Sequence, residues 1–359
     1  MTAAAMEFVR PLTFEALTRR PVLTSLWESG RALAHLDLAK TPDAIVVAPA
    51  TANLLARTAQ GIADDFLTAI LLAADVPVLL APGMNDDMFA HPATQVNLVT
   101  LRNRGWTIVG PHVGPLAEGP SDRPGRMAEP EEILVHVERL VRQRESKLRN
   151  RRVLVTAGPT REPLDPVRVF TNPSSGKMGF QLAERAFVRG ARVVMVAGPS
   201  ALPVPAGVAV VRVATTEEMR SAVAGHIPEA EVVIMAAAPA DYRPSTSSHE
   251  KRPRASGAIE IRLDPTIDVL ASTAGLRRAG SVAVGFALET GPGLERAREK
   301  LERKQLDLIV FNRVDELGSG FEVDTNRVTL VTAKAETPLE MLPKSEVAER
   351  ILDAVEALL

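Results

Sequence analysis

The chain has 359 residues, a formal net charge of -2 at pH 7 and 24% charged residues. This length predicts two domains of ordinary size, and the near-neutral charge excludes the basic excess of a nucleic-acid-binding protein. The chain contains no cysteine, which excludes disulfides, thiolate metal sites and a catalytic thiol.

The sequence shows neither a membrane-spanning segment nor a secretory signal. The longest apolar run, Ala69–Leu80, is interrupted by Asp75 and Pro77, so it falls short of the roughly 18 apolar residues that a spanning helix needs. The first residues, Met1–Glu7, lack a basic segment followed by an apolar one. We therefore expect a cytoplasmic protein.

The first half of the chain begins in an unusual way for a parallel α/β fold. A doubly wound sheet normally opens with a strand and a phosphate-binding turn, but this chain opens on Met1-Thr2-Ala3-Ala4-Ala5. In a flavodoxin-like strand order of 2-1-3-4-5, the missing first strand would lie inside the sheet and leave its neighbours unpaired. Either the true start lies upstream or this domain has decayed. Strands are expected at 44–48, 76–80 and 107–109, and helices at 53–74 and 94–105.

The second half repeats the alternation of short apolar runs and helical patterns. Between the halves, residues 130–152 read as a helix that runs into a polar, arginine-rich linker. This pattern predicts one domain over residues 1–145 and another over residues 146–359. Strands are expected at 153–156, 192–196, 231–235, 258–263, 282–286, 308–311 and 328–331.

The first expected strand of the second half ends in a Gly-Pro turn at Gly158, where open α/β sheets bind nucleotides. Farther on, Asn172-Pro173-Ser174-Ser175-Gly176-Lys177 leads into an amphipathic helix. Serines and a glycine at a helix start favour anion binding, although an ordinary helix cap explains them equally well. Gly176-Lys177 is not a Walker A loop, because Met178 stands where a serine or threonine must reach magnesium.

Nearly the whole chain resembles the bacterial bifunctional phosphopantothenoylcysteine decarboxylase/phosphopantothenate-cysteine ligases. In the second half, the resemblance rests on Thr156–Arg168, Asn172–Gly179, Ala236–Tyr242, Glu250-Lys251, Val284–Thr290, Lys300 and Lys304. It implies a Rossmann-like parallel-sheet ligase domain that follows a flavodoxin-like flavin-decarboxylase domain. It also implies coenzyme A biosynthesis: CTP activates 4'-phosphopantothenate as an acyl-cytidylate, and cysteine then displaces CMP.

The same resemblance assigns roles in the ligase half. Asn172 resembles the family's catalytic asparagine, Lys251 is assigned to catalysis and CTP, and Asp241 is assigned to the nucleotide and Mg²⁺. Because Lys300 and Lys304 are four residues apart, they share one face of an expected helix at 295–305 and could bind one triphosphate. The resemblance assigns to CTP Ala236, Ala237, Asp241, Lys251, Ile267, Asp268, Val269, Leu270, Phe286, Lys300 and Lys304.

Each of these residues also has an ordinary explanation when it is taken alone. A lone lysine is usually a solvated surface residue, and an aspartate after a strand, such as Asp241, can be a cap. A loop asparagine such as Asn172 is most often a turn former, and Phe286 could be core. The basic segment 242–257 is poor in apolar residues, so we interpret it as a flap that a polyanion orders.

The first half resembles the family's flavin-dependent decarboxylase through His35–Leu38, Ala48–Asn53, Pro82–Phe89 and Pro124–Met127. The resemblance implies that FMN serves decarboxylation of 4'-phosphopantothenoylcysteine to 4'-phosphopantetheine. His35 would be the active-site base, although a histidine beside a leucine is more often structural, and Asn85 would hold the substrate carboxylate. Glu118 replaces the family's proton-donating cysteine. FMN contacts are assigned to Ala48, Pro49, Thr51 and Asn53.

Three alternatives remain at this stage. The first is a monofunctional ligase with a non-catalytic N-terminal assembly domain, which is motivated by the missing first unit and by Glu118. The second is a dinucleotide-dependent oxidoreductase, which the absence of a G-x-G-x-x-G motif with a following acidic residue disfavours. The third is a regulatory binding module, which the presence of Asn172, Asp241 and Lys251 disfavours. The family resemblance further implies a homo-oligomer.

Overall fold

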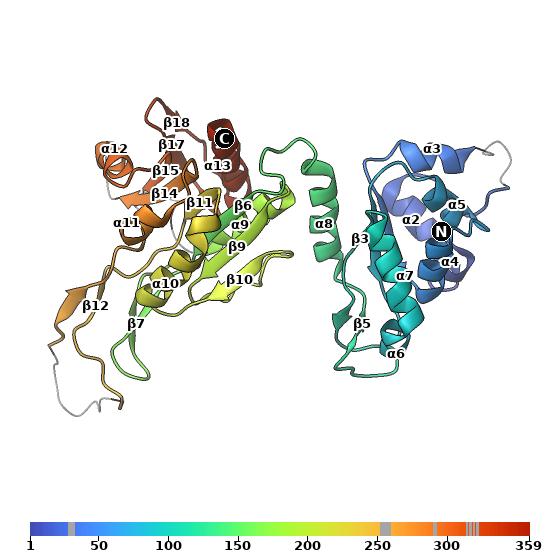
Figure 1. Ribbon diagram of the computed structural model, residues 1–359, viewed down its shortest axis with the longest axis horizontal. Helices are drawn as coiled ribbons and strands as arrows, with labels where there is room; N and C mark the ends of the chain where they lie inside the picture. Colours follow the sequence, from blue (N-terminus) through green and yellow to red (C-terminus); the bar gives the residue numbers. More distant parts are fainter. Residues whose placement is uncertain are drawn as a thin grey trace. The chain divides into compact units, whose positions relative to one another are not determined.

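The computed structural model describes residues 1–27, 33–251, 260–289, 293–313, 315, 318, 320 and 323–359. It divides into two compact units, Met1–Val141 and Arg142–Leu359, and each unit is described by itself below (Figure 1). In the described part of the chain, none of the helices has the length and apolar character needed to cross a membrane.

Unit 1 contains a three-stranded parallel sheet with the order β1-β2-β3. The strands are β1 (Ile45–Ala50), β2 (Val78–Pro82) and β3 (Thr107–Ile108), which confirms the three predicted positions. β2 is buried along its whole length, whereas Val46 on the edge strand β1 is 40% exposed. The described residues before β1 form only helices and loops: α1 (Ala3–Met6), α2 (Pro11–Thr18) and α3 (Ala34–Lys40).

The prediction of one long helix over 53–74 is wrong, because two helices occupy this stretch. α4 (Ala52–Gln60) ends at Gly61, whose positive φ of 74° suits glycine. α5 (Phe66–Ala73) starts with a capping box in which Asp65 and Thr68 exchange hydrogen bonds. The other elements of unit 1 are α6 (Asp86–Ala90), α7 (Pro92–Asn103), β4 (His112–Val113), β5 (Pro124–Arg126) and α8 (Pro130–Arg142), which crosses into unit 2.

Unit 2 is built on an eight-stranded sheet with the order β10-β9-β6-β11-β14-β15-β17-β18. The strands from β10 to β15 are parallel, and β17 and β18 extend the sheet with antiparallel pairs. Their bounds are β6 (Arg152–Ala157), β9 (Arg192–Ala197), β10 (Ala209–Arg212), β11 (Val232–Met235), β14 (Val282–Glu289), β15 (Leu308–Arg313), β17 (Val328–Val331) and β18 (Glu336–Pro338).

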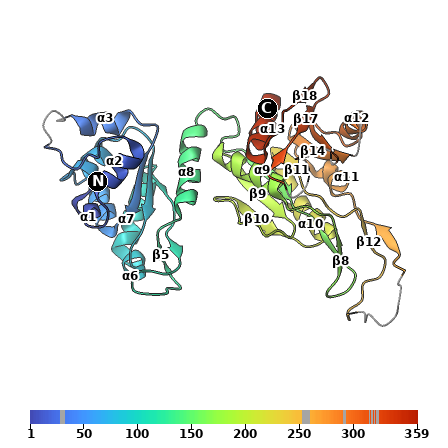
Figure 2. The same ribbon diagram turned by 180° about the vertical axis from the view of Figure 1, so that it is seen from behind.

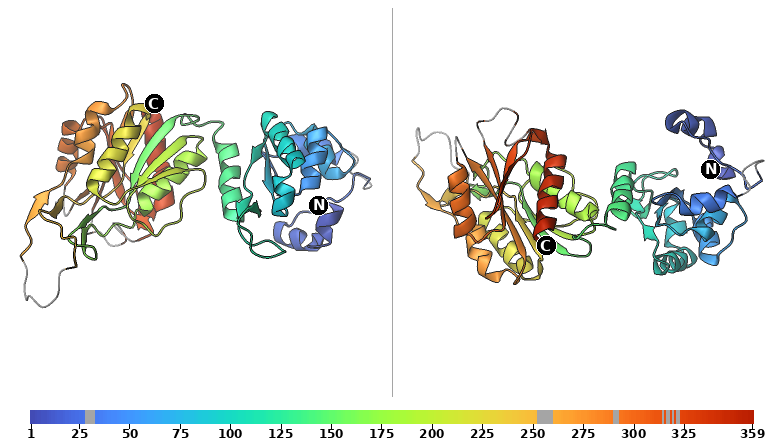
Figure 3. Two further views of the ribbon diagram at one scale, coloured as in Figure 1. Left: turned by 60° about the horizontal axis from the view of Figure 1, so that its bottom comes forward. Right: turned by 90° about the horizontal axis from the view of Figure 1, so that it is seen from above.

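Helices cover both faces of this sheet, as expected for strands that are buried on both sides (Figures 1 and 3). α9 (Lys177–Val188) and α13 (Lys344–Leu358) pack on one face. α10, α11 and α12 pack on the other, where Leu154, Val233 and Ile309 join their apolar side chains in one core. The bounds on this second face are α10 (Thr216–His226), η1 (Ile227–Glu229), α11 (Val269–Thr273), η3 (Ala274–Leu276) and α12 (Leu294–Arg303).

Two hairpins project from unit 2 side by side (Figures 1 and 2). One consists of β7 (Arg161–Pro163) and β8 (Val169–Thr171), and the other of β12 (Tyr242–Pro244) and β13 (Leu263–Pro265). The predicted strand at 258–263 is therefore misplaced: residues 260–262 are not in a strand, and residues 258–259 lie outside the described ones. A third short pair joins β16 (Thr325–Asn326) to β19 (Leu342–Pro343).

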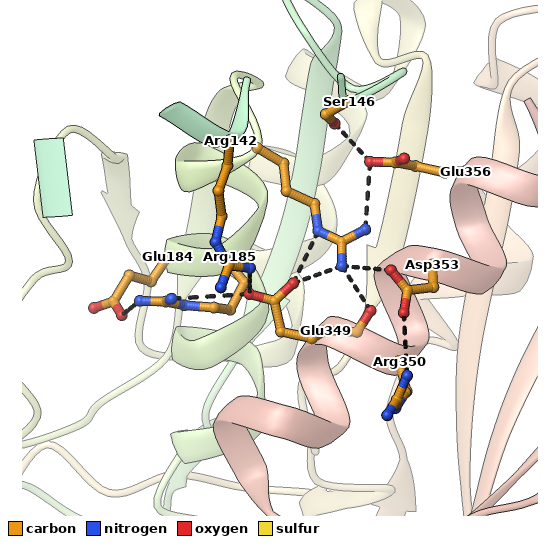
Figure 4. Close-up of polar contacts among 9 residues, drawn as sticks. Arg142, Ser146, Glu184, Arg185, Glu349, Arg350, Asp353 and Glu356 are labelled. Carbon is orange, nitrogen blue, oxygen red and sulfur yellow. Dashed lines mark hydrogen bonds and ion pairs between the residues drawn. The ribbon is translucent and has the colours of Figure 1, made fainter. Parts of the chain in front are cut away.

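A buried ion cluster ties α9 to α13 (Figure 4). Arg189, which follows α9, is 8% exposed and donates hydrogen bonds to Glu349 at 3.0 Å, Asp353 at 2.6 Å and Glu356 at 3.3 Å. Burial alone would lower the pKa of Arg189, but the bonds to Glu349 and Asp353 outweigh it and raise that pKa. Because a buried charge is costly unless it is paired, this cluster fixes how α9 sits against α13.

Candidate functional site

Two cavities open at the carboxyl edge of the parallel strands in unit 2. The first cavity has a volume of about 210 Å³ and the second about 390 Å³. They meet where the same residues line both of them: Ala237, Pro239, Asp241, Phe286 and Lys300. This edge, beyond the carboxyl ends of parallel strands, is where such sheets bind ligands.

The first cavity combines an apolar wall with charged groups. The wall includes Met219 and Met235, and α11 and the turn before it complete this side. Most of the residues predicted to contact CTP line this cavity: Ala237, Asp241, Ile267, Asp268, Val269, Leu270, Phe286, Lys300 and Lys304. Ala236 lines the second cavity instead. Sequence reasoning missed the two methionines, which belong to an apolar pattern that reads as core.

The predicted pair of lysines is present at one end of the first cavity. Lys300 lies on α12 and donates from Nζ to the carbonyl oxygen of Phe286 at 2.7 Å. Burial lowers the pKa of Lys300, and the nearby charge of Lys304 lowers it further. A bound phosphate group would oppose this lowering of the Lys300 pKa, because it places negative charge beside two ammonium groups that repel each other.

Asp268 is the acidic partner in this cavity. Its carboxylate caps α11 by accepting from Ala271 N at 3.0 Å, and it accepts from Lys304 Nζ at 2.6 Å. Burial alone would raise the pKa of Asp268, but the hydrogen bond from Ala271 and then that from Lys304 lower it. The carboxylate is thus held from two sides.

The loop that carries Asp241 is fixed by a buried polar network that sequence reasoning did not find. Thr160 Oγ1 accepts from Ala240 N at 2.9 Å and lies 2.8 Å from Thr216 Oγ1. Glu162 is 4% exposed and accepts from both the backbone nitrogen and the hydroxyl of Thr216 at 2.8 Å. Thr160 and Glu162 both belong to the Thr156–Arg168 motif. The sequence signal that could have indicated this network is therefore the presence of these polar residues in that motif.

Asn172 lines the second cavity, and its side-chain amide faces backbone oxygens. Its Nδ2 donates to the carbonyl of Pro239 at 2.9 Å and to that of Ala238 at 3.3 Å. The amide therefore holds the loop before Asp241 at its start, while Thr266 holds its end by donating to Ala240 O at 2.6 Å. The donor of Asn172 is directed at this loop rather than into open space.

The second cavity is formed largely by the segment that leads into α9. Gly176, with φ of 83°, is the N-cap of α9, and a Cβ there would lie 3.1 Å from the Cα of Gly158. Gly179 packs even closer, since a Cβ on it would lie 2.6 Å from that of Ala157. Both glycines bring the start of α9 onto the end of β6, and residues 176–179 line the cavity. The backbone N–H of Lys177 donates to Ser175 Oγ at 3.5 Å.

Two lysines at the second cavity were not assigned a role from the sequence. Lys177 Nζ pairs with Asp324 Oδ1 at 2.7 Å. Lys344 is only 5% exposed and donates to the carbonyls of Gly320 at 3.0 Å and Val323 at 2.6 Å. Burial lowers the pKa of Lys344, and the charge of Lys177 adds to this. No motif marks Lys344, because its partners lie about twenty residues away.

Lys251 is not brought to either cavity. It is exposed, and it lies outside the residues that line the two cavities. The segment before it is attached to the β7–β8 turn, where Ser248 N donates to Leu164 O at 3.0 Å. The remainder of the expected flap, 252–257, lies outside the described residues.

In unit 1, the structure joins two of the three predicted catalytic residues. Asn85 Nδ2 donates to Glu118 Oε1 at 3.0 Å, while Asn85 Oδ1 caps α6 by accepting from Asp87 N and Met88 N. The loop with Glu118 is anchored to α6, because Ser121 Oγ donates to Asp86 Oδ2 at 2.6 Å. Both Asn85 and Glu118 therefore have defined positions.

His35 lies apart from that pair in its contacts. It is the second residue of α3, which packs against α5, and its buried Nδ1 has no hydrogen-bond partner among the described residues. None of the hydrogen bonds between described residues links His35 to Asn85 or to Glu118. An orphaned buried ring nitrogen is costly unless a ligand or water satisfies it.

The residues predicted to bind FMN gather at the carboxyl end of β1. Ala48 and Pro49 are exposed there, Thr51 caps α4 by accepting from Leu54 N at 3.3 Å, and Asn53 lies exposed in the first turn. An exposed strand end beside a helix start suits a flavin, because such positions offer backbone groups and a positive dipole. The exposed strand end and the helix start therefore fit the cofactor.

Among the described residues, no three His, Asp or Glu side chains are grouped so that they could hold a metal ion. Asp241 therefore stands as a single carboxylate at the junction of the cavities. Mg²⁺ often binds through one or two carboxylates together with substrate phosphates, and a single aspartate is compatible with that mode.

Comparisons with known proteins match both units. Residues 148–359 match the family model described as DNA/pantothenate metabolism flavoprotein C-terminal domain, and residues 1–142 match the model described as Flavoprotein. The coenzyme A biosynthesis bifunctional protein CoaBC of Vibrio vulnificus is 40% identical over 363 residues, which cover 100% of this chain and 90% of that protein.

Two further similarities concern individual activities and the fold. A cysteine/cysteine sulfinic acid decarboxylase from an unknown prokaryotic organism is 42% identical over 351 residues, 96% of this chain and 98% of that protein. The crystal structure of the C-terminal domain of a CoaBC protein is 40% identical, with a TM-score of 0.50, and covers 59% of this chain and 96% of that chain.

Proposed function

Since the chain belongs to the family of bifunctional coenzyme A biosynthesis proteins, with a ligase domain and a flavoprotein decarboxylase domain, we propose that residues 146–359 form the ligase. This domain joins 4'-phosphopantothenate to cysteine at the expense of CTP. The observation that carries the proposal is the meeting of the two cavities at Asp241, Phe286 and Lys300.

CTP would occupy the first cavity and extend toward the second. Its base would lie against Phe286 and the residues 267–270, with Ala236 and Ala237 beneath it. Its phosphates would bind Lys300 and Lys304, and Mg²⁺ would bind Asp241 together with phosphate oxygens. Lys251 is exposed and lies outside both cavities in this structure, so it would bind the phosphates only from a position other than the one described.

The reaction has two displacement steps. The carboxylate oxygen of 4'-phosphopantothenate attacks the α-phosphorus, and the bond to the β-phosphate breaks as pyrophosphate leaves. The cysteine nitrogen then attacks the acyl carbon, loses a proton, and CMP leaves. Both steps develop negative charge on phosphate or carbonyl oxygens, so fixed cations and donors accelerate them. Asn172 would be the catalytic asparagine. Its amide donates to the carbonyls of Pro239 and Ala238 in this structure, and it would hold the acyl-cytidylate carbonyl during aminolysis.

For residues 1–145 we propose FMN-dependent decarboxylation of 4'-phosphopantothenoylcysteine to 4'-phosphopantetheine. Ala48, Pro49, Thr51 and Asn53 would hold FMN, which supplies reversible two-electron oxidation when bound. His35 would be the active-site base. Asn85 would bind the substrate carboxylate, and Glu118 would supply the proton. The alternative is a monofunctional ligase whose N-terminal half serves only in a homo-oligomer.

A second candidate substrate for unit 1 is free cysteine or its sulfinate. The relative named for that decarboxylation matches along 98% of its own length. Incubation of the protein with each of the three acids, followed by measurement of carbon dioxide and product mass, separates these substrates.

The test of the ligase proposal is direct. Purified protein with CTP, Mg²⁺, 4'-phosphopantothenate and cysteine should release CMP and pyrophosphate in equal amounts and form 4'-phosphopantothenoylcysteine. Omission of cysteine should leave an acyl-cytidylate that mass spectrometry detects. If CMP forms at the same rate without 4'-phosphopantothenate, the acid is not the nucleophile and the proposal fails.

A further inference from the structure

A buried carboxylate in unit 2 has no place in the reaction described above. Glu162 lies on β7, is 4% exposed, and accepts at Oε1 from the backbone nitrogen and the hydroxyl of Thr216, both at 2.8 Å. Burial of a carboxylate is costly unless donors hold it. Glu162 lies outside the residues that line the two cavities, so it can act on a ligand there only through other residues.

The start of α10 does not need Glu162 as its cap. Thr216 is the first residue of this helix, and the residue before it, Thr215, accepts from Glu218 N at 3.2 Å. Glu218 is exposed and accepts in return from Thr215 N and Ala214 N, which completes a capping box. The helix is therefore capped by an exposed glutamate, and the buried one serves another purpose.

The hydroxyl groups next to Glu162 form a chain of hydrogen bonds that runs in one direction. Thr216 gives its single hydroxyl proton to Glu162, so it accepts from Thr160, whose Oγ1 lies 2.8 Å away. Thr160 Oγ1 in turn accepts from Ala240 N at 2.9 Å. The contact from Thr216 Oγ1 to Ala240 O is 3.5 Å long, which is too long to compete for the proton. A carboxylate at the end of such a chain polarises every bond in it.

The chain ends at the residue before Asp241, which lines both cavities. Thr160 is 0% exposed and Ala240 is 5% exposed, so the bond between them is shielded from water. On the other side, Thr266 donates to Ala240 O at 2.6 Å and to Asp241 O at 2.9 Å. Loss of the bond to Ala240 N would leave a buried donor unpaired, and the backbone that carries Asp241 would shift to satisfy it.

We propose that Glu162 is a positioning residue of the ligase: through Thr216 and Thr160 it fixes the backbone that presents the Asp241 carboxylate to Mg²⁺-CTP. The inference rests on the proposed function, because it concerns the residue that meets the nucleotide there. Glu162 then affects nucleotide affinity only while Asp241 is present, and an uncharged acceptor of the same shape preserves most of the effect.

Calorimetric titration of the full-length protein with CTP, with and without Mg²⁺, tests the positioning role. Glu162→Met removes the acceptor and should weaken Mg²⁺-CTP binding about tenfold or more, because two buried donors of Thr216 lose their partner. Glu162→Gln keeps an oxygen acceptor and should weaken it less than about threefold. Glu218→Gln is the matched control, since Glu218 also accepts at the start of α10 but lies outside the chain; it should bind like the wild type.

A double-substitution cycle shows whether Glu162 acts through Asp241. In an Asp241→Asn protein, Glu162→Met should weaken Mg²⁺-CTP binding by less than about twofold, because the carboxylate that it positions is already gone. A loss in the Glu162→Met protein that is confined to titrations with Mg²⁺ assigns the positioned carboxylate to the metal. An equal loss in both titrations assigns it to the nucleotide itself.

Hydrogen exchange at the amide of Ala240 tests the chain without any ligand. Exchange of this amide should accelerate about tenfold or more in Glu162→Met and in Thr160→Val, because both variants break the chain. Thr160→Ser keeps the hydroxyl and should exchange like the wild type. If Glu162→Met does not fold, Thr160→Val takes its place in the titrations and in the cycle, with Thr160→Ser as its control.

Three results would overturn the inference. Additive losses in the cycle would show that Glu162 does not act through Asp241. A loss in Glu218→Gln as large as that in Glu162→Met would show that any change at the start of α10 has this effect. Unchanged exchange at Ala240 in the variants that break the chain would show that the chain does not hold this amide. If the wild type binds no CTP, or binds it without ligation, the proposed function fails, while the exchange measurement still decides whether Glu162 holds the loop.

Discussion

The candidate sites of the two units differ in how completely the described residues enclose them. In unit 2, eight strands and helices on both faces bring Asp241, Phe286 and Lys300 to the junction of two cavities. In unit 1, three strands carry an exposed strand end, and Asn85 and Glu118 meet near the surface. Both halves resemble the family through their motifs to a similar extent. The site residues are nevertheless held in position much more completely in unit 2 than in unit 1.

Lys300→Met should have the largest effect and should separate the two units. Loss of a buried cation that faces phosphate should reduce ligation about 10²-fold to 10³-fold. Flavin binding and decarboxylation should stay unchanged, because Lys300 belongs to unit 2. Arg303→Met on the same helix is the control. Equal losses of both activities would show that the units do not work independently.

Asn172→Asp should slow the ligation about 10²-fold, mainly after activation. A carboxylate cannot donate the hydrogen bond that the amide would offer to the acyl-cytidylate carbonyl during aminolysis, so the second step should slow. Acyl-cytidylate should accumulate when cysteine is limiting, and quenched-flow mass spectrometry measures it. Normal turnover without extra intermediate would remove Asn172 from this role.

Glu118→Cys tests the weaker site. If the exposed glutamate is a poor proton donor, FMN-loaded wild-type protein should release carbon dioxide but leave much of its product as the enethiol. The cysteine variant should raise the yield of 4'-phosphopantetheine several-fold, as measured by product mass after a single turnover. Glu118→Gln keeps an acceptor for Asn85 but carries no proton, so it is the matched control. Full conversion by the wild type would make Glu118 a competent donor.

The smallest expected effect is a pH dependence of CTP binding. The pKa of Lys300 lies below its ordinary value of 10.5 in the free protein, and bound phosphate would raise it. Binding therefore takes up a proton, so affinity should fall as pH rises through the free-state pKa, by at most about tenfold per pH unit. Lys300→Met should flatten that dependence in calorimetric titrations. An unchanged slope would assign the proton to another group.

Most strands of the two sheets could be predicted because they are apolar runs between turn residues, as at 328–331, where prediction and structure coincide. The edge strands β10 and β18 were not predicted. The helix break at Gly61 was missed, because the apolar pattern continues across it while the Asp65–Thr68 capping box starts a new helix. The antiparallel addition of β17 and β18 follows from pairing geometry, which apolar patterns do not encode.

Site residues that are close together in sequence could be predicted. Site residues that depend on partners far away in sequence could not. Lys300 and Lys304 could be placed together because they are four positions apart at the end of one helix. Lys344 could not, since an isolated lysine predicts a solvated surface position, yet this one is 5% exposed. Its role depends on the carbonyls of Gly320 and Val323, and only the folded chain shows that relation.

The cluster between Arg189 and α13 also constrains the order of events during synthesis. Arg189 and Glu349 are 160 positions apart, so α9 leaves the ribosome long before its partner helix exists. At typical elongation rates of about 5–20 residues per second, that delay lasts roughly 10–30 seconds. Throughout this interval Arg189 lacks its three carboxylates and the face of α9 lacks its cover. A nascent chain therefore exposes this helix to chaperones and proteases, and the cavity at its start becomes a binding site only after α13 has docked.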